Sequence, residues 1–321
     1  MIECQYFNND FLTAVQDKIP QKSLLAGTLS DLLGIDKDAV YRRLRGDVSF
    51  TFAEMAVIAR RLGISLDKIA GVETGQCKSI RLAFTKHIDP SEVDYLMFEE
   101  YINALKFIKD EPDTKIMEGG HLIPCFLYFD YEYLSRVFMF RWSQNSFDGK
   151  CIPFHEVTIP DRMRELQKQS CFYSRHIKST ILLWDNSIFE QFVSMVKFYA
   201  KVRLINEEDV AHIKNELTMF LKFTEEIAIT GKYKDTGNNV SLYVGDLSSD
   251  ANLGLIESKN IRISMYWAFL LNNFSSFDSL FFEEINSWLQ SALRLTTLIS
   301  VSGEKIRNKF INSQQMIIDT L

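Results

Sequence analysis

The spacing of glycines and helix caps between residues 24 and 69 constrains the fold of this chain more than any other feature. Gly34, Gly46 and Gly63 each directly follow a short segment with an apolar helical pattern. A glycine after a helix readily adopts the positive φ that ends it, so these positions predict three helix ends. The stretch therefore predicts a compact set of short helices rather than one long helix or a sheet.

The polar residues before these segments predict where the helices begin. Asp10 and Asp36 are suited to cap the N-termini of helices, and Thr51 with Glu54 has the spacing of a capping box. Leucines recur along the inner face of the second segment. The predicted helices cover residues 10–19, 23–33, 37–45, 52–62 and 66–70.

The third predicted helix is rich in arginine on the side that faces away from the core. At about 100° per residue, Val40 and Leu44 face inward, whereas Asp38, Arg42 and Arg45 point outward. A short helix, a tight turn, an arginine-rich helix and two closing helices follow the order of a helix-turn-helix unit. Such a unit places its second helix in the major groove of DNA. The alternative is an arginine-rich, solvated helix in an ordinary helical domain.

Six residues of this helix are candidate DNA contacts, and each has an expected role. Lys37 and Arg42 are expected at base edges, because arginine can pair with O6 and N7 of guanine. Arg43 and Arg45 are expected at phosphates. Tyr41 is expected to pack on a thymine methyl group or to reach a phosphate. Asp38 is expected to stabilise the helix N-terminus, with a cytosine amine as the alternative partner. The six candidates are Lys37, Asp38, Tyr41, Arg42, Arg43 and Arg45.

The segments 34–46 and 51–67 together resemble the Xre/Cro-type family of bacterial helix-turn-helix regulators. The resemblance covers residues 8–72 and depends on spacing. A glycine precedes the third helix, Arg45-Gly46 ends it, and Leu62-Gly63-Ile64-Ser65-Leu66-Asp67 closes the unit. More narrowly, Val40-Tyr41-Arg42-Arg43-Leu44-Arg45-Gly46 followed by Phe50-Thr51-Phe52 is similar to a group of larger bacterial regulators with an uncharacterised C-terminal region.

This resemblance implies a five-helix, lambda-repressor-like domain that docks its third helix in the major groove, usually as a homodimer. Members of the family often begin the second helix with Ser-Gln, where the glutamine reaches a phosphate or a base. This chain has Leu25-Ala26 at those positions. The resemblance therefore implies DNA contact through the third helix more directly than through the second.

The charge and cysteine content set limits on the class of protein. The net charge of −6 has the wrong sign for binding nucleic acid along the whole chain, so any contact is expected at a local cationic site. The five cysteines are scattered without disulfide-scaffold or zinc-finger spacing, which favours a reducing cytoplasm. The first residues do not form a signal peptide. The longest apolar run, residues 122–129, is too short to cross a bilayer. We expect a soluble, cytoplasmic protein.

No motif in the chain predicts catalysis, a cofactor or a metal site. Cys151 and His155 are four residues apart, but Pro153 between them disfavours a helical pair of ligands. Residues 300–305 vaguely resemble an anion cradle without the P-loop spacing, so a helix start capped by Ser302 is the preferred interpretation. We therefore expect no enzyme activity, no cofactor and no metal.

The larger C-terminal region, residues 81–321, is predicted to be helix-rich α+β and to follow a linker at residues 73–80. Helices are expected from about Pro90 to Ile108, over 126–142, 163–173, 186–204 and 206–230, and over 278–298 and 302–321. Residues 115–124 are expected to be irregular or a strand. Alternation between residues 240 and 267 predicts a three-stranded antiparallel meander, and thus a small antiparallel sheet. The aromatic residues of 126–142 are expected to form core, with a ligand pocket as the alternative.

These features predict a mainly α protein that acts as a sequence-specific, DNA-binding transcriptional regulator. Residues 1–72 are expected to read double-stranded DNA, and the C-terminal region is expected to dimerise and to sense a peptide or small-molecule effector. The alternative is an interaction module that receives a peptide or a metabolite and for which DNA contact is secondary. An enzyme fused to a DNA-binding unit has no catalytic constellation in its favour.

Overall fold

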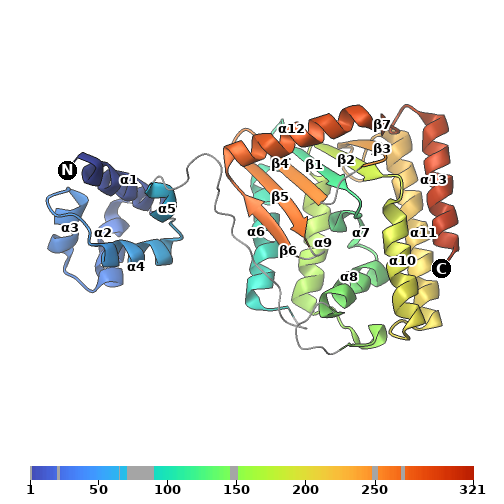
Figure 1. The fold of residues 1–321 in the computed structure, drawn as a ribbon, viewed down its shortest axis with the longest axis horizontal. Coiled ribbons are helices and arrows are strands. Elements are labelled where there is room, and N and C mark those ends of the chain that lie inside the picture. The colour runs from blue at the N-terminus through green and yellow to red at the C-terminus, as the bar shows by residue number, and fades with distance from the viewer. Residues whose placement is uncertain are drawn as a thin grey trace. The chain divides into compact units, whose positions relative to one another are not determined.

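The computed structural model describes residues 2–19, 22–64, 66–70, 90–144, 151–247, 252–268 and 272–321. The chain divides into two compact units, an N-terminal unit (Met1–Ser79) and a C-terminal unit (Ile80–Leu321), and we describe each by itself (Figure 1). The predicted linker at 73–80 lies outside the described residues. No helix in the described ranges is long and apolar enough to cross a membrane.

The N-terminal unit consists of short helices around a core of its own, as the sequence predicts. The core residues include Phe11, Leu29 and Ile58, none of which is exposed. Gly34, Gly46 and Gly63 all adopt positive φ, at 65°, 81° and 65°. The helices are α1 (Ile2–Lys18), α2 (Lys22–Leu33), α3 (Lys37–Leu44), α4 (Phe52–Leu62) and α5 (Leu66–Ile69).

The first helix is longer than the sequence predicts. It begins at Ile2, so Asp10 lies within the helix and does not cap it. Phe7 packs against the same core as Phe11 and Val15, at a spacing of four residues. The apolar stripe thus begins one turn before Asp10, and burial of that turn outweighs the capping preference of the aspartate.

The C-terminal unit is built on a mixed sheet of seven strands in the order β6-β5-β4-β1-β2-β3-β7 over the described residues (Figure 1). At its centre, β2 pairs in parallel with β1 on one side and with β3 on the other. Antiparallel strands extend both edges. The strands are β1 (Lys115–Gly120), β2 (Ser179–Asp185), β3 (Asn239–Gly245), β4 (Asn252–Glu257), β5 (Arg262–Ala268), β6 (Asn272–Ser276) and β7 (Thr297–Leu298).

The predicted small antiparallel sheet, with a three-stranded meander over 240–267, is wrong. The β4–β5 hairpin is antiparallel as expected, but β3 pairs with β2 and β4 pairs with β1. The sequence analysis missed β2, whose run Thr180-Ile181-Leu182-Leu183-Trp184 contributes to the cores on both faces of the sheet. Such a run lacks the alternation that marks a half-exposed strand, and its pairing partners are distant in sequence.

Helices cover the two faces of this sheet unequally. One face packs against the larger core, which is formed mainly by helices. These are α6 (Glu92–Ile108), α7 (Cys125–Tyr128), α8 (Glu132–Gln144), α9 (Asp161–Arg175), α10 (Ile188–Lys201), α11 (Glu207–Thr230), α13 (Glu304–Asp319) and the short 3-10 helix η1 (Phe154–Glu156). The other face packs against α12 (Ser279–Leu295) through Phe282, Ile285 and Leu289 (Figure 1). The sheet is therefore enclosed between a thick helical layer and one helix.

Three predicted helices of this unit differ in detail. The helix expected over 126–142 is broken into α7 and α8, because the chain turns at Asp130, whose carboxylate pairs with Arg175 at 2.7 Å. In the first turns of α6 the apolar residues Val93 and Leu96 are exposed, whereas Asp94 is buried. The residue at the N-cap of α13 is Gly303, with φ 69°, and not Ser302.

Replacement of Leu289 by alanine should destabilise the C-terminal unit by about 2–5 kcal/mol, because the cavity left under α12 has no other helix to fill it. Leu295→Ala on the same helix is the matched control, since Leu295 is 82% exposed and should change stability by less than about 0.5 kcal/mol. Urea denaturation followed by tryptophan fluorescence measures this unit, because all four tryptophans lie within it. Equal losses in the two variants would contradict the packing described for α12.

Candidate nucleic-acid interface

The N-terminus of α3 is fixed by Asp36. Its side chain accepts a hydrogen bond from the backbone N–H of Ala39 at 2.7 Å, as the capping role predicted from the sequence requires. This bond satisfies one of the unpaired N–H groups at the helix start. Lys37 and Asp38 follow in the first turn, and both are exposed.

The C-terminus of α3 is fixed by Gly46. Its N–H donates to the carbonyl of Arg43 at 3.0 Å, and the N–H of Asp47 donates to the carbonyl of Arg42 at 2.9 Å. These two bonds form a Schellman motif, for which the positive φ of Gly46 is required. Both ends of this helix are therefore held by local hydrogen bonds, and its side chains project from a defined backbone.

Five of the six candidate contact residues share the outer side of α3. Val40 is fully buried and α3 packs against α2, so the inner side of the helix is occupied. At about 100° per residue, the five exposed positions span an arc of roughly 140°. Lys37, Asp38, Tyr41, Arg42 and Arg45 form this exposed arc.

Arg43 lies outside the exposed arc and is bound to α4. Its Nη2 lies 2.8 Å from Oε1 of Glu54, and its Nε lies 3.1 Å from Oε2. Its Nη1 also donates to the carbonyl of Ala39 at 3.1 Å. The two charged side chains are only 16% and 17% exposed. The geometry thus gives Arg43 a contact within the protein where the sequence analysis expected a phosphate.

Glu54 connects this ion pair to the cap of α4. Its Oε2 also accepts the backbone N–H of Thr51 at 2.8 Å, and the Thr51 hydroxyl accepts the N–H of Glu54. Partial burial opposes ionisation, but the bonds from Arg43 and Thr51 outweigh it and lower the pKa of Glu54 below its usual value. One carboxylate therefore caps α4 and holds α3 against it.

The cations of the exposed arc differ in their partners. Arg45 pairs with Asp47 at 3.0 Å, but both side chains are more than half exposed, and such pairs contribute little. Among the described residues, no carboxylate pairs with Lys37 or Arg42. These two cations are therefore directed at solvent with their charge uncompensated, which suits a polyanionic partner.

Two residues in the first turn of α2 are turned inward, whereas Leu24 before them is exposed. Leu25 is 5% exposed and Ala26 is 2% exposed, so both pack in the core of the N-terminal unit. These are the positions at which the Xre/Cro-type regulators that the sequence resembles often carry Ser-Gln. Their burial agrees with an interface that depends on α3.

The sequence analysis missed the second role of Glu54. The capping box identifies Glu54 as a residue whose carboxylate binds the backbone N–H of Thr51. That role gives no reason to expect an ion pair as well. The pairing with Arg43 spans eleven residues and follows from the packing of α3 beside α4. A capping carboxylate near an inward-facing arginine is the signal that could have indicated it.

The Arg43–Glu54 pair should show a coupling free energy of about 1–3 kcal/mol in a double-mutant cycle with alanine, because both groups are mostly buried and the bond is bidentate. The measurement is far-ultraviolet circular dichroism during denaturation of the full chain, with tryptophan fluorescence as a reference for the C-terminal unit. Arg42→Ala is the control and should change stability by less than about 0.5 kcal/mol. Additive effects of the two alanine substitutions would show that the pair does not hold α3 in place.

Comparison with known families gives one match, and it falls on this part of the chain. Residues 10–80 match the BetR domain, a family of helix-turn-helix-like DNA-binding domains. No curated protein and no solved structure matches the chain. The match suggests a DNA-binding regulatory role, with DNA as a partner.

Proposed function

We propose that this protein is a sequence-specific transcriptional regulator that inserts α3 into the major groove of DNA. The observation that carries the proposal is the exposed arc of α3, in which Lys37 and Arg42 lack a carboxylate partner among the described residues. The match of residues 10–80 to a DNA-binding family supports it. The proposal keeps the Xre/Cro-type docking mode that the sequence resembles, and it assigns no catalytic step to the chain.

Each residue of the exposed arc has a role that follows from its position. Arg42 and Lys37 would contact base edges, since neither must break an ion pair to do so. Arg45 would exchange its exposed contact with Asp47 for a phosphate. Tyr41, 45% exposed, would pack on a thymine methyl group or bind a phosphate, and Asp38 would stabilise the helix start. Arg43 would act as a positioning residue through Glu54.

We also propose that the protein binds as a homodimer in the cytoplasm, with the C-terminal unit as the dimerisation and effector-receiving region. Two copies of α3 related by a two-fold axis would read a pseudo-palindrome with half-sites about one helical turn apart. An effector that binds the C-terminal unit could then alter the spacing of the two copies of α3. A cavity in the C-terminal unit supports a small molecule as the effector.

Arg42→Ala should weaken binding to the cognate site by about 1–3 kcal/mol and relax the preference at one base pair. The measurement is fluorescence anisotropy with full-length protein, on the selected site and on variants of it. Arg294→Ala removes the same charge from an exposed position of the C-terminal unit and is the matched control. An unchanged base preference in Arg42→Ala would remove this arginine from the set of residues that read bases.

Selection from a randomised duplex pool at low salt should enrich sites with two similar half-sites whose centres lie about 10 base pairs apart. Sedimentation of the complex should show two chains per duplex. Arg43→Ala should lower the affinity for all selected sequences by a similar factor, because it loosens α3 without removing a base contact. Failure of the full chain to enrich any sequence would overturn the proposed function.

A further inference from the structure

The C-terminal unit contains a cavity of about 120 Å³ between the sheet and the helices α6, α8 and α10. An engineered cavity of about 150 Å³ in another protein binds benzene, so this one has room for a small organic molecule. Several of the side chains that line it are aromatic, and they include Phe98, Phe126, Phe138, Trp142, Phe192 and Trp267. A pocket of this kind, with few polar groups, is typical of a small-molecule site.

Glu118, in the middle of β1, directs a carboxyl group into this cavity. The residue is 7% exposed, and among the described residues no group forms a hydrogen bond or an ion pair with its side chain. Gly254 on β4 makes room beside it, because a Cβ atom there would lie 2.6 Å from the ring of Trp267 and 3.2 Å from Cγ of Glu118. The backbone thus allows an indole ring to lie close to an unpartnered carboxyl group.

Within the described ranges, no positively charged group pairs with the Glu118 carboxyl group. Its titratable neighbours are Tyr101 on α6, Cys125 on α7 and Tyr233 after α11, and burial, followed by the effect of Glu118, raises the pKa of Tyr101 and of Cys125. Burial also raises the pKa of Tyr233. All three are therefore neutral at pH 7. Burial raises the pKa of Glu118 itself to about 8.

Two other charged residues line the cavity. Asp94 already accepts hydrogen bonds from the N–H and the hydroxyl of Ser91, at 2.7 and 2.6 Å. Arg141 is partly buried, and burial lowers the pKa of its guanidinium group. The nearby hydroxyl groups of Tyr128 and Tyr199 act in the opposite direction. Of the residues Asp94, Glu118 and Arg141 that line the cavity, Glu118 is therefore the buried carboxyl group to which no group in the described residues forms a hydrogen bond or an ion pair.

We propose that this cavity binds a small amphipathic amine, whose ammonium group pairs with Glu118 and whose apolar body lies among the aromatic side chains. The ammonium group supplies the charge that the protein lacks at Glu118, and aromatic faces attract cations. Such an amine would be the effector of the proposed regulator. Its binding to the cavity does not require the proposed function, but an effect of that binding on DNA recognition does.

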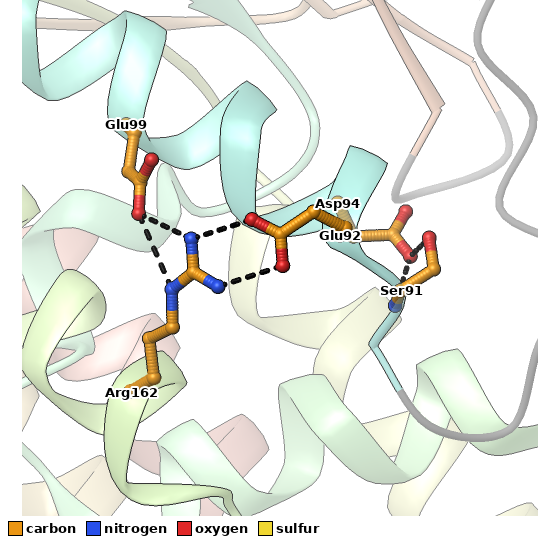
Figure 2. Close-up of polar contacts among 5 residues, drawn as sticks. All are labelled: Ser91, Glu92, Asp94, Glu99 and Arg162. Carbon is orange, nitrogen blue, oxygen red and sulfur yellow. Dashed lines mark hydrogen bonds and ion pairs between the residues drawn. The ribbon is translucent and has the colours of Figure 1, made fainter.

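The wall of the cavity that α6 forms is held in place from outside. Figure 2 shows Arg162 of α9 between Glu92 and Glu99 of α6, while Asp94 turns toward Ser91. Nη1 of Arg162 lies 2.8 Å from Oε2 of Glu92, and its Nη2 lies 2.7 Å from Oε1 of Glu99. Arg162 also lies over the ring of Tyr95, 4.4 Å from its centroid. The outer face of α6 is thus bound to α9, while Asp94, Met97, Phe98 and Tyr101 contact the cavity.

The test is isothermal titration calorimetry of the full-length protein at pH 8 with 2-phenylethylamine, which joins an ammonium group to a single aromatic ring. The neutral 2-phenylethanol and the anionic phenylacetate are the comparison probes. The amine should bind roughly tenfold or more tightly than the alcohol, and Glu118→Gln should remove that advantage. Glu284→Gln, on the exposed side of α12, is the matched control and should leave binding unchanged.

The pH dependence of amine binding gives a second readout that does not depend on a variant. Below pH 8 the free carboxyl group holds a proton that the amine must displace, so the affinity should fall roughly tenfold per pH unit. Equal binding of the amine to wild-type protein and Glu118→Gln, preferred binding of phenylacetate, or no binding of any probe would overturn the proposal. DNA binding is measured separately on the same samples. Loss of the amine proposal therefore leaves the proposed DNA-binding function intact, and loss of the DNA-binding function leaves the amine proposal intact.

Discussion

The bidentate pair between Arg43 and Glu54 is the contact on which the candidate DNA interface depends. A helix of two turns has little stability of its own, so its orientation must come from caps and from packing. Asp36 and Gly46 hold the two ends of α3, and Val40 anchors its inner side. Glu54 then connects α3 to the first turn of α4 by one carboxylate. The exposed arc can be rigid because an arginine of the same helix is used inside the protein.

The C-terminal unit poses the opposite problem, because it buries a carboxyl group without a partner. Burial of a charge is costly unless it is paired, and Glu118 is 7% exposed. Its pKa, raised to about 8, means that ionisation at pH 7 would cost on the order of 1 kcal/mol. A structural role would be served as well by an apolar residue of similar size. An unpartnered acid at the wall of an aromatic cavity is better explained by a ligand.

How much of this could be predicted from the sequence depends on the range of the interactions involved. The ends of α3 and α4 could be predicted, because caps and glycines act within a few residues of the position they mark. The pairing of β1, β2 and β3 could not, since it joins segments about sixty residues apart and β2 lacks a period. The outer side of α3 could also be predicted, because helical periodicity is a local property. The partner of Arg43 and the surroundings of Glu118 could not, because they involve residues distant in sequence.

A physical route by which a ligand could influence the N-terminal unit follows from the chain order. The helix α6 is the first described element of the C-terminal unit after the N-terminal unit, and its inner face lines the cavity. A ligand shifts an equilibrium only by the difference in its affinity for the two states. The proposed pairing of an ammonium group with Glu118 would supply such a difference, because it would offset the cost of burying the ionised carboxylate. Arg162 bonds the outer face of α6 to α9, so any shift of α6 on binding must strain or break these bonds. The side chains that limit such a response are therefore Glu92, Glu99 and Arg162.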